Sequence, residues 1–544
     1  MIETKHLVVS IGLILVGMMV GGETLAQAPK VEVSSEYKLG KNKTLQGHLD
    51  SDESGHYLYF NDRKRQHRYT PSIGMTKYDH NFKELWTYDY LPSLRVRTTN
   101  VGMKVMKENF LWLYVEEPKK TKRDYILSSI DRNGKLAKKV EVNSLGFRNP
   151  SEAPVLSWTV SEDSTMVAVA QTFDRNISTA DFEYDVQVLD SDLNILWESS
   201  VWMKGKAQSQ IEVLSFVLGN DGVFYALVKE YEDKKAKESK KKKTRKGSKK
   251  VPAYDLKIYK LGKGMKKPEV LKLNIKDKYA KGASLAIDEA GVITCVGMYG
   301  NDRNRNINGV FFQRLNAEGQ IDVTNQKEFS ARDIEILGKR NTDKEKDGSG
   351  SIEGSFVFGT QLTQLDGSIV ISAEDNYSLQ NRFTGTNNLN RNNLNGSNLN
   401  GNSLTTYYSQ DIVVIHFESN GEIRHINLIP KTQSSLTREF IYHGSVALDN
   451  QPVFFIFNDN KDNIDRPIDK RAKAMTGSTN SVTTLNYIDD KGVLQKEVLI
   501  DNREIRSLVL PSTIKRVDEN SFIFIALRPR GIAKSSFYIG TVEF

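Results

Sequence analysis

Runs of four to eight apolar residues recur along almost the whole chain, separated by short clusters of Asn, Asp and Gly. The pattern is clearest between residues 211 and 275, which hold four such runs. An Asn-Asp-Gly turn at 220–222 joins the first two runs, and a Gly-Lys-Gly turn at 262–264 joins the last two. Turn residues between β-prone runs are a strong hairpin signal. This segment therefore predicts a four-stranded antiparallel meander, with strands A to D, tight A–B and C–D turns and a long B–C connection.

The same meander repeats along the chain. Strands of the B type are expected at 57–60, 110–115, 166–171, 223–228, 292–298, 368–373, 453–457 and 522–527. Strands of the C type are expected at 74–78, 125–130, 184–189, 254–261, 310–315, 412–417, 482–488 and 536–542. Repeated four-stranded meanders are typical of propeller blades. The pattern thus predicts an all-β fold, a β-propeller of four-stranded antiparallel blades. Eight blades are favoured, and seven blades plus an irregular hairpin are the alternative.

The last repeat lacks a run for its fourth strand, because its C strand reaches the end of the chain. A β-prone run at 31–39 belongs to none of the repeats. Pairing this run with the last repeat would close the ring and remove two exposed strand edges. We therefore expect the N-terminal strand to complete the terminal blade.

Through this repeated turn-strand-turn pattern over about 31–544, the chain resembles secreted β-propeller repeat proteins in general. The C strands do not end in Trp-Asp, and the chain has no Ser-x-Asp-x-Gly-x-Thr-Trp box, so no single propeller family is indicated. The resemblance implies the architecture and not an activity. Trp86 and Trp197 begin strand D in two repeats, and we interpret them as packing anchors between blades.

The first 28 residues have the features of a secretory signal peptide. Lys5 precedes an apolar run at 7–20, and Ala26-Gln27-Ala28 is a small-x-small cleavage site. We expect cleavage near Ala28, no membrane span afterwards and a secreted or periplasmic protein; an N-terminal membrane anchor is the alternative. Residues 29–544 are then a single propeller domain with a Lys-rich insert at 232–252 and an Asn-rich insert at 376–410. The single cysteine, Cys295, excludes an intramolecular disulfide and is expected to be a small buried residue.

The basic balance of the chain belongs to one loop. The formal net charge is +8, but residues 234–250 hold eleven Lys or Arg and one Glu, which leaves about −2 for the rest of the chain. This distribution argues against a specific nucleic-acid surface on the propeller. The Lys-rich loop is expected to be solvated and mobile, and it would attract anionic surfaces weakly.

Long inserts fall mainly at the B–C and D–A end of the predicted blades, so one face carries the elaboration. Function concentrates on variable loops carried by a rigid scaffold. Polar residues also recur just after the B strands at that face. Among them, Arg has a planar guanidinium group that can donate two parallel hydrogen bonds to a carboxylate or another anion. The candidate ligand-binding residues are Asp62, Arg63, Asp174, Arg175, Asp302, Arg303, Asp459, Arg528 and Arg530. In the alternative interpretation these residues cap loops and form ion pairs between blades.

No motif in the chain identifies a catalytic, metal or cofactor site. It lacks His-Glu-x-x-His, Gly-x-Ser-x-Gly and phosphate-binding Gly-rich motifs, and no acidic loop has EF-hand spacing. The favoured hypothesis is an exported, non-enzymatic binding or scaffold propeller that engages a protein or glycan partner of the cell envelope through its insert-rich face. The alternative is a carbohydrate-active hydrolase or lyase that uses Asp residues at the channel mouth.

Overall fold

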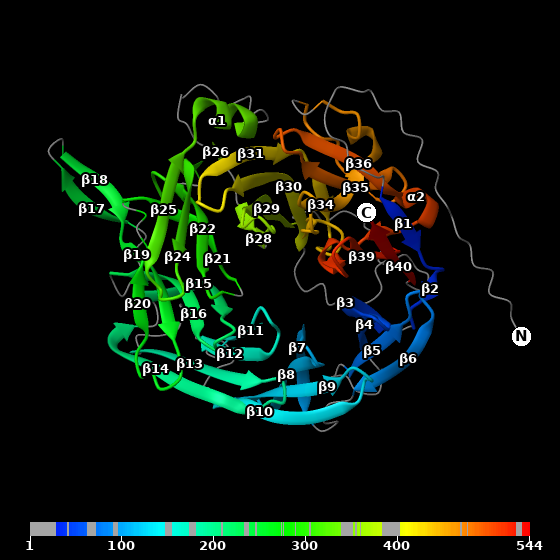
Figure 1. Ribbon diagram of the computed structural model, residues 1–544, viewed down its shortest axis with the longest axis horizontal. Helices are drawn as coiled ribbons and strands as arrows, with labels where there is room; N and C mark the ends of the chain where they lie inside the picture. Colours follow the sequence, from blue (N-terminus) through cyan, green and yellow to red (C-terminus); the bar gives the residue numbers. More distant parts are fainter. Residues whose placement is uncertain are drawn as a thin grey trace, which may run out of the picture.

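The computed structural model shows an all-β ring of eight four-stranded antiparallel blades (Figure 1), as the sequence predicts. It describes residues 29–544 except 41–42, 63–71, 91–95, 147–154, 173–180, 208–209, 233–238, 245–246, 274, 276, 289, 304–305, 339–351, 354–355, 360, 383–402, 468–469, 476 and 529–535. The predicted signal peptide, residues 1–28, lies outside the described residues.

Blades 1 to 4 each contain four strands in meander order. Blade 1 consists of β3 (Lys43–Asp52), β4 (Gly55–Asp62), β5 (Ser72–Tyr78) and β6 (Glu84–Tyr90). Blade 2 consists of β7 (Arg97–Val105), β8 (Asn109–Lys119), β9 (Lys122–Asp131) and β10 (Leu136–Gly146). Blade 3 consists of β11 (Val155–Val160), β12 (Met166–Thr172), β13 (Asp181–Asp190) and β14 (Ile195–Ala207). Blade 4 consists of β15 (Ile211–Leu218), β16 (Phe224–Tyr231), β19 (Tyr254–Leu261) and β20 (Glu269–Lys272).

In blades 5 to 8 some strands are split or come from distant segments. Blade 5 consists of β21 (Tyr279–Ile287), β22 (Ile293–Gly300), β24 (Gly309–Leu315) and β25 (Ile321–Glu328). Blade 6 consists of β27 (Phe356–Phe358) and β28 (Leu362–Thr363) as its split first strand, β29 (Ile369–Arg382), β30 (Ser403–Phe417) and β31 (Ile423–Ile429), with β32 (Gln433–Ser435) beside β30. Blade 7 consists of β33 (Gly444–Val446), β34 (Phe454–Asn460), β35 (Ser481–Ile488) and β36 (Leu494–Asp501). Blade 8 consists of β37 (Leu508–Val509) and β38 (Lys515–Arg516), β39 (Ser521–Leu527), β40 (Ser536–Glu543), and the N-terminal β1 (Lys30–Val33) and β2 (Tyr37–Lys38).

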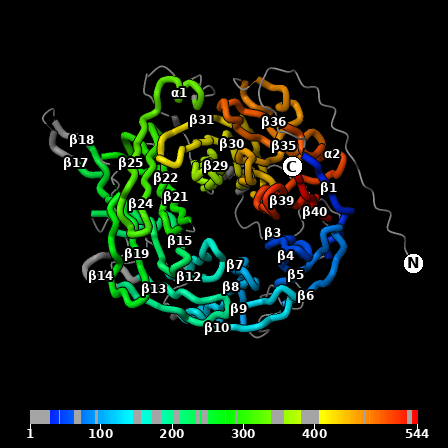
Figure 2. The backbone as a smooth tube through the Cα atoms, viewed as in Figure 1, coloured from blue at the N-terminus to red at the C-terminus, as the bar shows by residue number. Residues whose placement is uncertain are grey.

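The N-terminal strands close the ring, as expected. Strand β1 pairs antiparallel with β40 from Lys30 opposite Glu543 to Val33 opposite Gly540. The Tyr37 ring then stacks on Phe537, with ring centroids 5.1 Å apart. Figure 2 shows the blue start of the described chain beside its red end. Two segments about 500 residues apart in sequence thus complete one sheet. The edge of β40 that faces away from β39 is covered by β1.

The short turns follow from their Asp and Gly residues. In the C–D turn of blade 2, Gly134 N–H donates to Asp131 O at 2.9 Å, and Asp131 Oδ1 accepts from two further backbone N–H groups. Gly134 has φ +80°, which a side chain rarely adopts, and a Cβ there would lie 2.4 Å from the Tyr88 ring of blade 1. Glycine therefore meets both the turn geometry and the close approach of the neighbouring blade.

Equivalent hydrogen bonds join successive blades at these turns. Asn325 of blade 5 donates to Gly421 O at 2.9 Å, and Asn427 of blade 6 donates to Gly492 O at 2.8 Å. Trp197 Nε1 likewise donates to Gly222 O of the next blade, and Trp86 lies against Gly134. The prediction that both tryptophans anchor neighbouring blades is confirmed.

The core consists of apolar layers between adjacent blades. Phe312 of blade 5 and Phe417 of blade 6, for example, have ring centroids 5.4 Å apart in one such layer. Cys295 is fully buried in another layer, where burial raises the pKa of its thiol. It is therefore a packing residue, as expected.

Two inserts contain more regular structure than the sequence suggests. The Lys-rich insert forms a hairpin of β17 (Ser239–Thr244) and β18 (Gly247–Pro252), which projects from the outer rim of the ring (Figure 1). The sequence pattern did not predict these two strands. They follow β16 and precede β19, where Tyr231 pairs with Tyr254. The solvation and mobility of this insert stay predictions. In blade 6, β29 and β30 extend to Arg382 and from Ser403, so both ends of the predicted Asn-rich insert are strands.

Short helices and small sheets occupy the remaining connections. They are α1 (Ala331–Gly338), α2 (Asn502–Ile505), the 3-10 turns η5 (Lys461–Asn463) and η6 (Pro511–Thr513), and the pair of β23 (Asn306–Ile307) and β26 (Ile352–Glu353). The sequence pattern did not predict α1, whose start is capped by reciprocal bonds between Ser330 and Asp333. None of the helices among the described residues is long and apolar enough to cross a membrane.

Candidate ligand-binding cavity

The predicted candidate residues do not meet at one described site. The side chains of Asp62, Arg63, Asp174, Arg175 and Arg530 lie outside the described residues. Asp302 and Arg303 are exposed in the bend after β22. Arg528 is half-exposed, and its Nη1 lies 3.7 Å from Glu36 Oε1. A ligand role for this set stays a prediction.

Asp459 is the one described candidate that is buried. Its Oδ1 accepts from Asn460 N–H at 2.8 Å and from Asn463 Nδ2 at 2.7 Å, and its Oδ2 lies 3.3 Å from Lys496 Nζ. The side chain is 1% exposed. The bonds to Asn460 and Asn463 fit the loop-capping part of the alternative interpretation, whereas the ion pair with Lys496 lies within blade 7 and does not join two blades.

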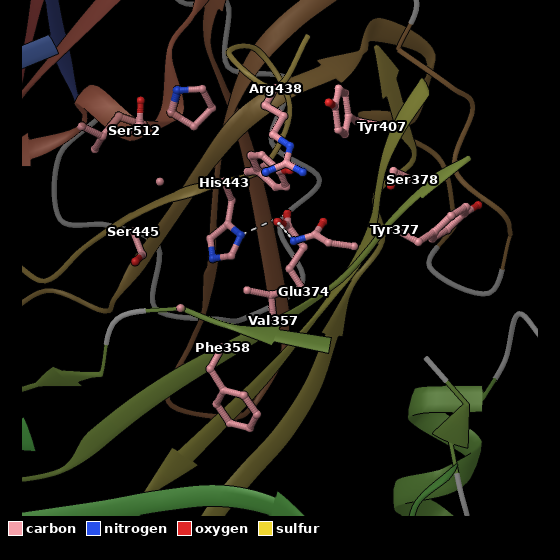
Figure 3. A pocket seen from close by; sticks show the side chains of 16 residues that line it. Val357, Phe358, Glu374, Tyr377, Ser378, Tyr407, Arg438, His443, Ser445 and Ser512 are labelled. Carbon is pink, nitrogen blue, oxygen red and sulfur yellow. Dashed lines mark hydrogen bonds and ion pairs between the residues drawn. The ribbon is translucent and has the colours of Figure 1, made fainter. Parts of the chain in front are cut away.

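A cavity of about 610 Å³ opens instead beside blade 6, at the insert-rich end of the ring. Its walls come from the first strands of blades 6 and 7, from the η6 turn of blade 8, from the base of the β29–β30 hairpin and from the connection that follows β32. The polar side chains in its lining are Glu374, Asn376, Ser378, Tyr407, Arg438, Tyr442, His443, Ser445 and Ser512 (Figure 3). We call this the blade-6 cavity. Three blades shape it, and no single repeat contains it.

A β-bulge at the base of the hairpin shapes one wall. The register moves from Glu374 opposite Ile412 to Asn376 opposite Ser409, so β30 carries the extra residue. Bulges re-aim side chains at such positions. Glu374, Asn376 and Ser378 alternate along β29 towards the cavity, whereas Tyr377 points away (Figure 3) and stacks on Tyr408 at 4.8 Å. Tyr377 also belongs to the cavity lining, so the tyrosine pair stands at the edge of the cavity.

Glu374 is the centre of a buried polar network. Lys431 Nζ donates to Glu374 Oε1 and, at 2.7 Å, to Ser409 Oγ. Asn376 Nδ2 donates to Glu374 Oε2 at 3.0 Å. Burial alone would raise the pKa of Glu374, but the Lys431 charge and the His443 hydrogen bond outweigh it and lower this pKa to about 2. Glu374 is thus a fixed carboxylate whose charge is offset by a fully buried ammonium.

His443 connects this carboxylate to Ser372. His443 Nδ1 lies 3.1 Å from Glu374 Oε1, and His443 Nε2 lies 3.0 Å from Ser372 Oγ (the first contact is dashed in Figure 3). A carboxylate only accepts hydrogen bonds, so Nδ1 carries the proton and Nε2 accepts from the serine. The order Ser-His-Glu matches that of a nucleophilic hydrolase relay.

The position of Ser372 does not suit a nucleophile. Ser372 is 2% exposed in the middle of β29 and is absent from the cavity lining. Gly359 covers it: Gly359 N–H donates to Ser372 O at 2.8 Å, and a Cβ at Gly359 would lie 2.4 Å from Ser372 Oγ. A substrate carbonyl has no room beside this hydroxyl. The relay therefore orients His443 in the cavity wall.

The opposite wall combines a cation, an aromatic ring and a strained residue. The Arg438 guanidinium lies over the Tyr407 ring, 4.6 Å from its centroid. Tyr442 has φ +81°, an unfavourable conformation for a residue with a side chain. Gln433, itself fully buried, accepts from Tyr442 N–H at 3.1 Å and donates to Asn458 O of blade 7. Backbone strain of this kind persists where the surrounding structure imposes it, and it is concentrated at functional sites.

The sequence contains only a faint signal for this cavity. Asn376 belongs to the polar ends of B strands, and residues 430–443 stand out as a long D–A connection. Nothing in the local pattern distinguishes Glu374, Arg438 or His443 from other polar residues, since they are brought together by contacts across 57–71 positions of the chain or by the fold of the connection. Among the described residues, no group of three or more His, Cys, Asp or Glu side chains could hold a metal ion.

The comparisons with known proteins leave the chain without a family. No protein-family model matches it, and no curated protein does. Among solved structures, the WD40 domain of SCAP from fission yeast shares 9% identity at a TM-score of 0.38, covering 95% of this chain and 98% of its own. The β-propeller domain of the Trilobed protease from Pyrococcus furiosus shares 10% identity at a TM-score of 0.36, and the match covers 86% of this chain and 98% of that domain. A Penicillium chrysogenum alpha-L-arabinanase complexed with arabinobiose shares 10% identity at a TM-score of 0.30, and the match covers 64% of this chain and 94% of the arabinanase chain. At these scores the likenesses carry no argument, and the propeller assignment rests on the eight blades and their closing strand.

Proposed function

We propose that this protein is an exported, non-enzymatic binding propeller that holds a protein or glycan partner of the cell envelope in the blade-6 cavity. The observation that carries the proposal is the composition of the cavity walls: a fixed carboxylate with its amide neighbour faces a guanidinium that rests on an aromatic ring. Binding sites typically combine aromatic surface with a few oriented polar groups. The segment at residues 1–28 is the basis for export.

The carboxylate chemistry of the cavity favours binding over hydrolysis. Glycosidases need two carboxylates about 5–10 Å apart, and one of them needs a raised pKa to act as the acid. Among the described lining residues Glu374 is the only carboxylate, and its pKa is about 2. Glu374 is 3% exposed and its oxygens already accept from Lys431, His443 and Asn376, so it is suited to orient the polar groups of the cavity wall.

The test is capture of a partner by the purified secreted protein, from envelope extract and on a glycan array. The proposal expects one partner class whose binding is lost in a Tyr407→Ala, His443→Ala double variant. A matched control is Leu365→Ser, which changes a 71% exposed residue in a short turn at the other face. Binding that survives the cavity variant would overturn this site, and turnover of a bound glycan would favour the hydrolase alternative. Sequencing the N-terminus of the secreted protein tests cleavage near Ala28.

A further inference from the structure

Arg438 is the uncompensated charge of the blade-6 cavity. Lys431 offsets Glu374 inside the wall, so the pair adds no net charge to the cavity. Arg438 is exposed, and within the part of the chain that the structure describes it has no ion-pair partner. An Arg whose plane rests on a ring is held in place, with its N–H fork available to a carboxylate. The cavity is therefore suited to an anionic group at this wall.

The other walls present hydroxyl, amide and carboxylate groups. Glu374 Oε2 and Asn376 lie on β29, Ser378 follows on the same face, and Tyr442 lies near Arg438. A saccharide matches such walls, because each of its hydroxyls both donates and accepts and its C–H faces pack on aromatic rings. An extended peptide would instead be held by the main chain of a free strand edge. Beside Glu374, β29 is paired on both sides, with β27 at Ala373–Asp375 and with β30, so a peptide ladder could form only from Asn376 onward, where the described partner of β29 is β30 alone.

We propose that the ligand of the blade-6 cavity is an acidic saccharide, whose carboxylate binds Arg438 while its hydroxyls bind Asn376, which Glu374 orients, and Ser378. This inference rests on the proposed function and narrows its partner class. The carboxylate source is a uronic acid unit of an envelope or environmental polysaccharide. A protein partner with an acidic side chain is the competing class.

The test is calorimetric titration of the whole secreted protein with oligosaccharides of galacturonate, of mannuronate and guluronate, and of glucuronate. Each is paired with the same oligosaccharide after its carboxylates have been reduced to alcohols. We expect at least one uronate to bind more than tenfold tighter than its reduced form. Arg438→Gln should remove that preference, and Arg438→Lys should restore only part of it, because an ammonium lacks the planar fork.

Two matched controls locate the effect. Arg332→Gln and Arg503→Gln remove exposed guanidinium groups on α1 and α2 that lie outside the cavity lining, and both should leave the affinity within twofold of wild type. If they, and not Arg438→Gln, abolish the carboxylate preference, the proposed cavity is the wrong site.

The remaining outcomes separate this inference from the proposed function. Equal affinity for uronate and reduced forms, lost in Tyr407→Ala, overturns the acidic ligand and leaves a binding cavity. Absence of binding to every saccharide, with a captured protein whose binding depends on Glu374 and Tyr407, overturns the saccharide and again leaves the proposed function. Absence of any partner that depends on the cavity overturns both.

Discussion

Blades 6 and 7 carry matching carboxylates that have opposite surroundings. Glu374 and Asp459 both lie on the second strand, opposite Ile412 and Val482 of the third strands, but β29 continues for eight residues beyond Glu374 whereas β34 ends one residue after Asp459. Each carboxylate faces a lysine supplied by or just after the fourth strand, Lys431 in blade 6 and Lys496 in blade 7. Yet Glu374 lines a cavity, whereas Asp459 is enclosed by its own insert.

The inserts cause this difference. In blade 7 the chain after β34 turns back at η5, and Asn463 bonds both Asp459 and the backbone of Lys473. In blade 6 the chain after Glu374 continues outward as the long β29–β30 hairpin, and only its base approaches the carboxylate. The same pair of residue types is therefore a structural clamp in one blade and part of an open wall in the next. A carboxylate at a strand end does not by itself indicate a ligand site.

The largest expected effect is on stability, from removal of the two lysines. Lys431→Met leaves Glu374 buried without its ammonium and should lower the free energy of unfolding by about 3–5 kcal/mol. Lys496→Met should cost only about 1–2 kcal/mol, because Asp459 keeps two N–H donors and Lys496 is partly solvated. Chemical denaturation checks both. A Glu374→Gln, Lys431→Met double variant should recover part of the loss, and equal losses in the two lysine variants would contradict the comparison.

The second effect is a dependence of stability on pH that belongs to blade 6. The pKa of Glu374 is about 2 in the folded protein and 4.5 for the free side chain, so the unfolded state binds more protons between these values. The stabilisation is complete above pH 4.5 and decreases as the pH falls towards 2, by about 3 kcal/mol in total. Glu374→Gln should make the stability curve less steep in this window, measured by denaturation at each pH. The remaining slope includes Asp52 of blade 1, whose pKa is also lowered to about 2.

A separate window serves as an internal reference for that experiment. Burial lowers the pKa of His56 to about 4 from 6.5, so stability should also decrease as the pH falls from 6.5 to 4. His416 of blade 6, whose pKa burial also lowers to about 4, contributes to the same window, and both contributions should be unchanged in Glu374→Gln. Loss of both windows in that variant would mean that the variant perturbs the whole ring.

The third effect is on ligand affinity. Glu374→Gln should weaken binding of the cavity ligand by roughly tenfold, because Asn376 and His443 lose the charged acceptor that orients them in the wall. Asp459→Asn should change affinity by less than about twofold, although it destabilises blade 7. Titration of both variants with the ligand found by capture provides the comparison. A stronger loss of affinity in Asp459→Asn would reverse the assignment of the two carboxylates.

The fourth effect concerns the strained wall. Tyr442→Gly relieves the φ of +81° and should leave the free energy of unfolding unchanged or raise it by up to about 1 kcal/mol, while ligand affinity falls. Tyr442→Phe keeps the backbone conformation and removes only the hydroxyl, so it isolates the contribution of that group. Thermal denaturation and ligand titration are the measurements. A large loss of stability in the glycine variant would show that the Tyr442 ring contributes more to packing than to ligand binding.

The smallest effect is expected from the Lys-rich hairpin. Replacing residues 234–249 with a short Gly-Ser linker keeps the buried Val251 and should change the free energy of unfolding by less than about 0.5 kcal/mol. Cavity binding should be unchanged, whereas adsorption to anionic lipid vesicles should decrease. Loss of cavity binding would mean that the ligand reaches both inserts.

The sequence by itself determined the architecture, because the information is local. Each Asp-x-x-Gly turn, such as Asp131 to Gly134, forces the chain to reverse, and the alternation of turn and strand counts eight blades. The unassigned N-terminal run and the missing fourth strand of the last repeat identified each other as partners, since a closed ring needs both.

Only the tertiary structure decided where the cavity lies and which polar residues face it. Glu374, Lys431 and His443 are separated by up to 69 positions, and their meeting depends on the bulge in β30 and on how the connection after β32 is tied to blade 7 through Gln433. The fate of Asp459 likewise depends on an insert that folds back over it. The course of each insert is set by long-range packing, which produces no periodic pattern in the sequence. The insert-rich face could therefore be predicted from the chain, and the blade-6 cavity could not.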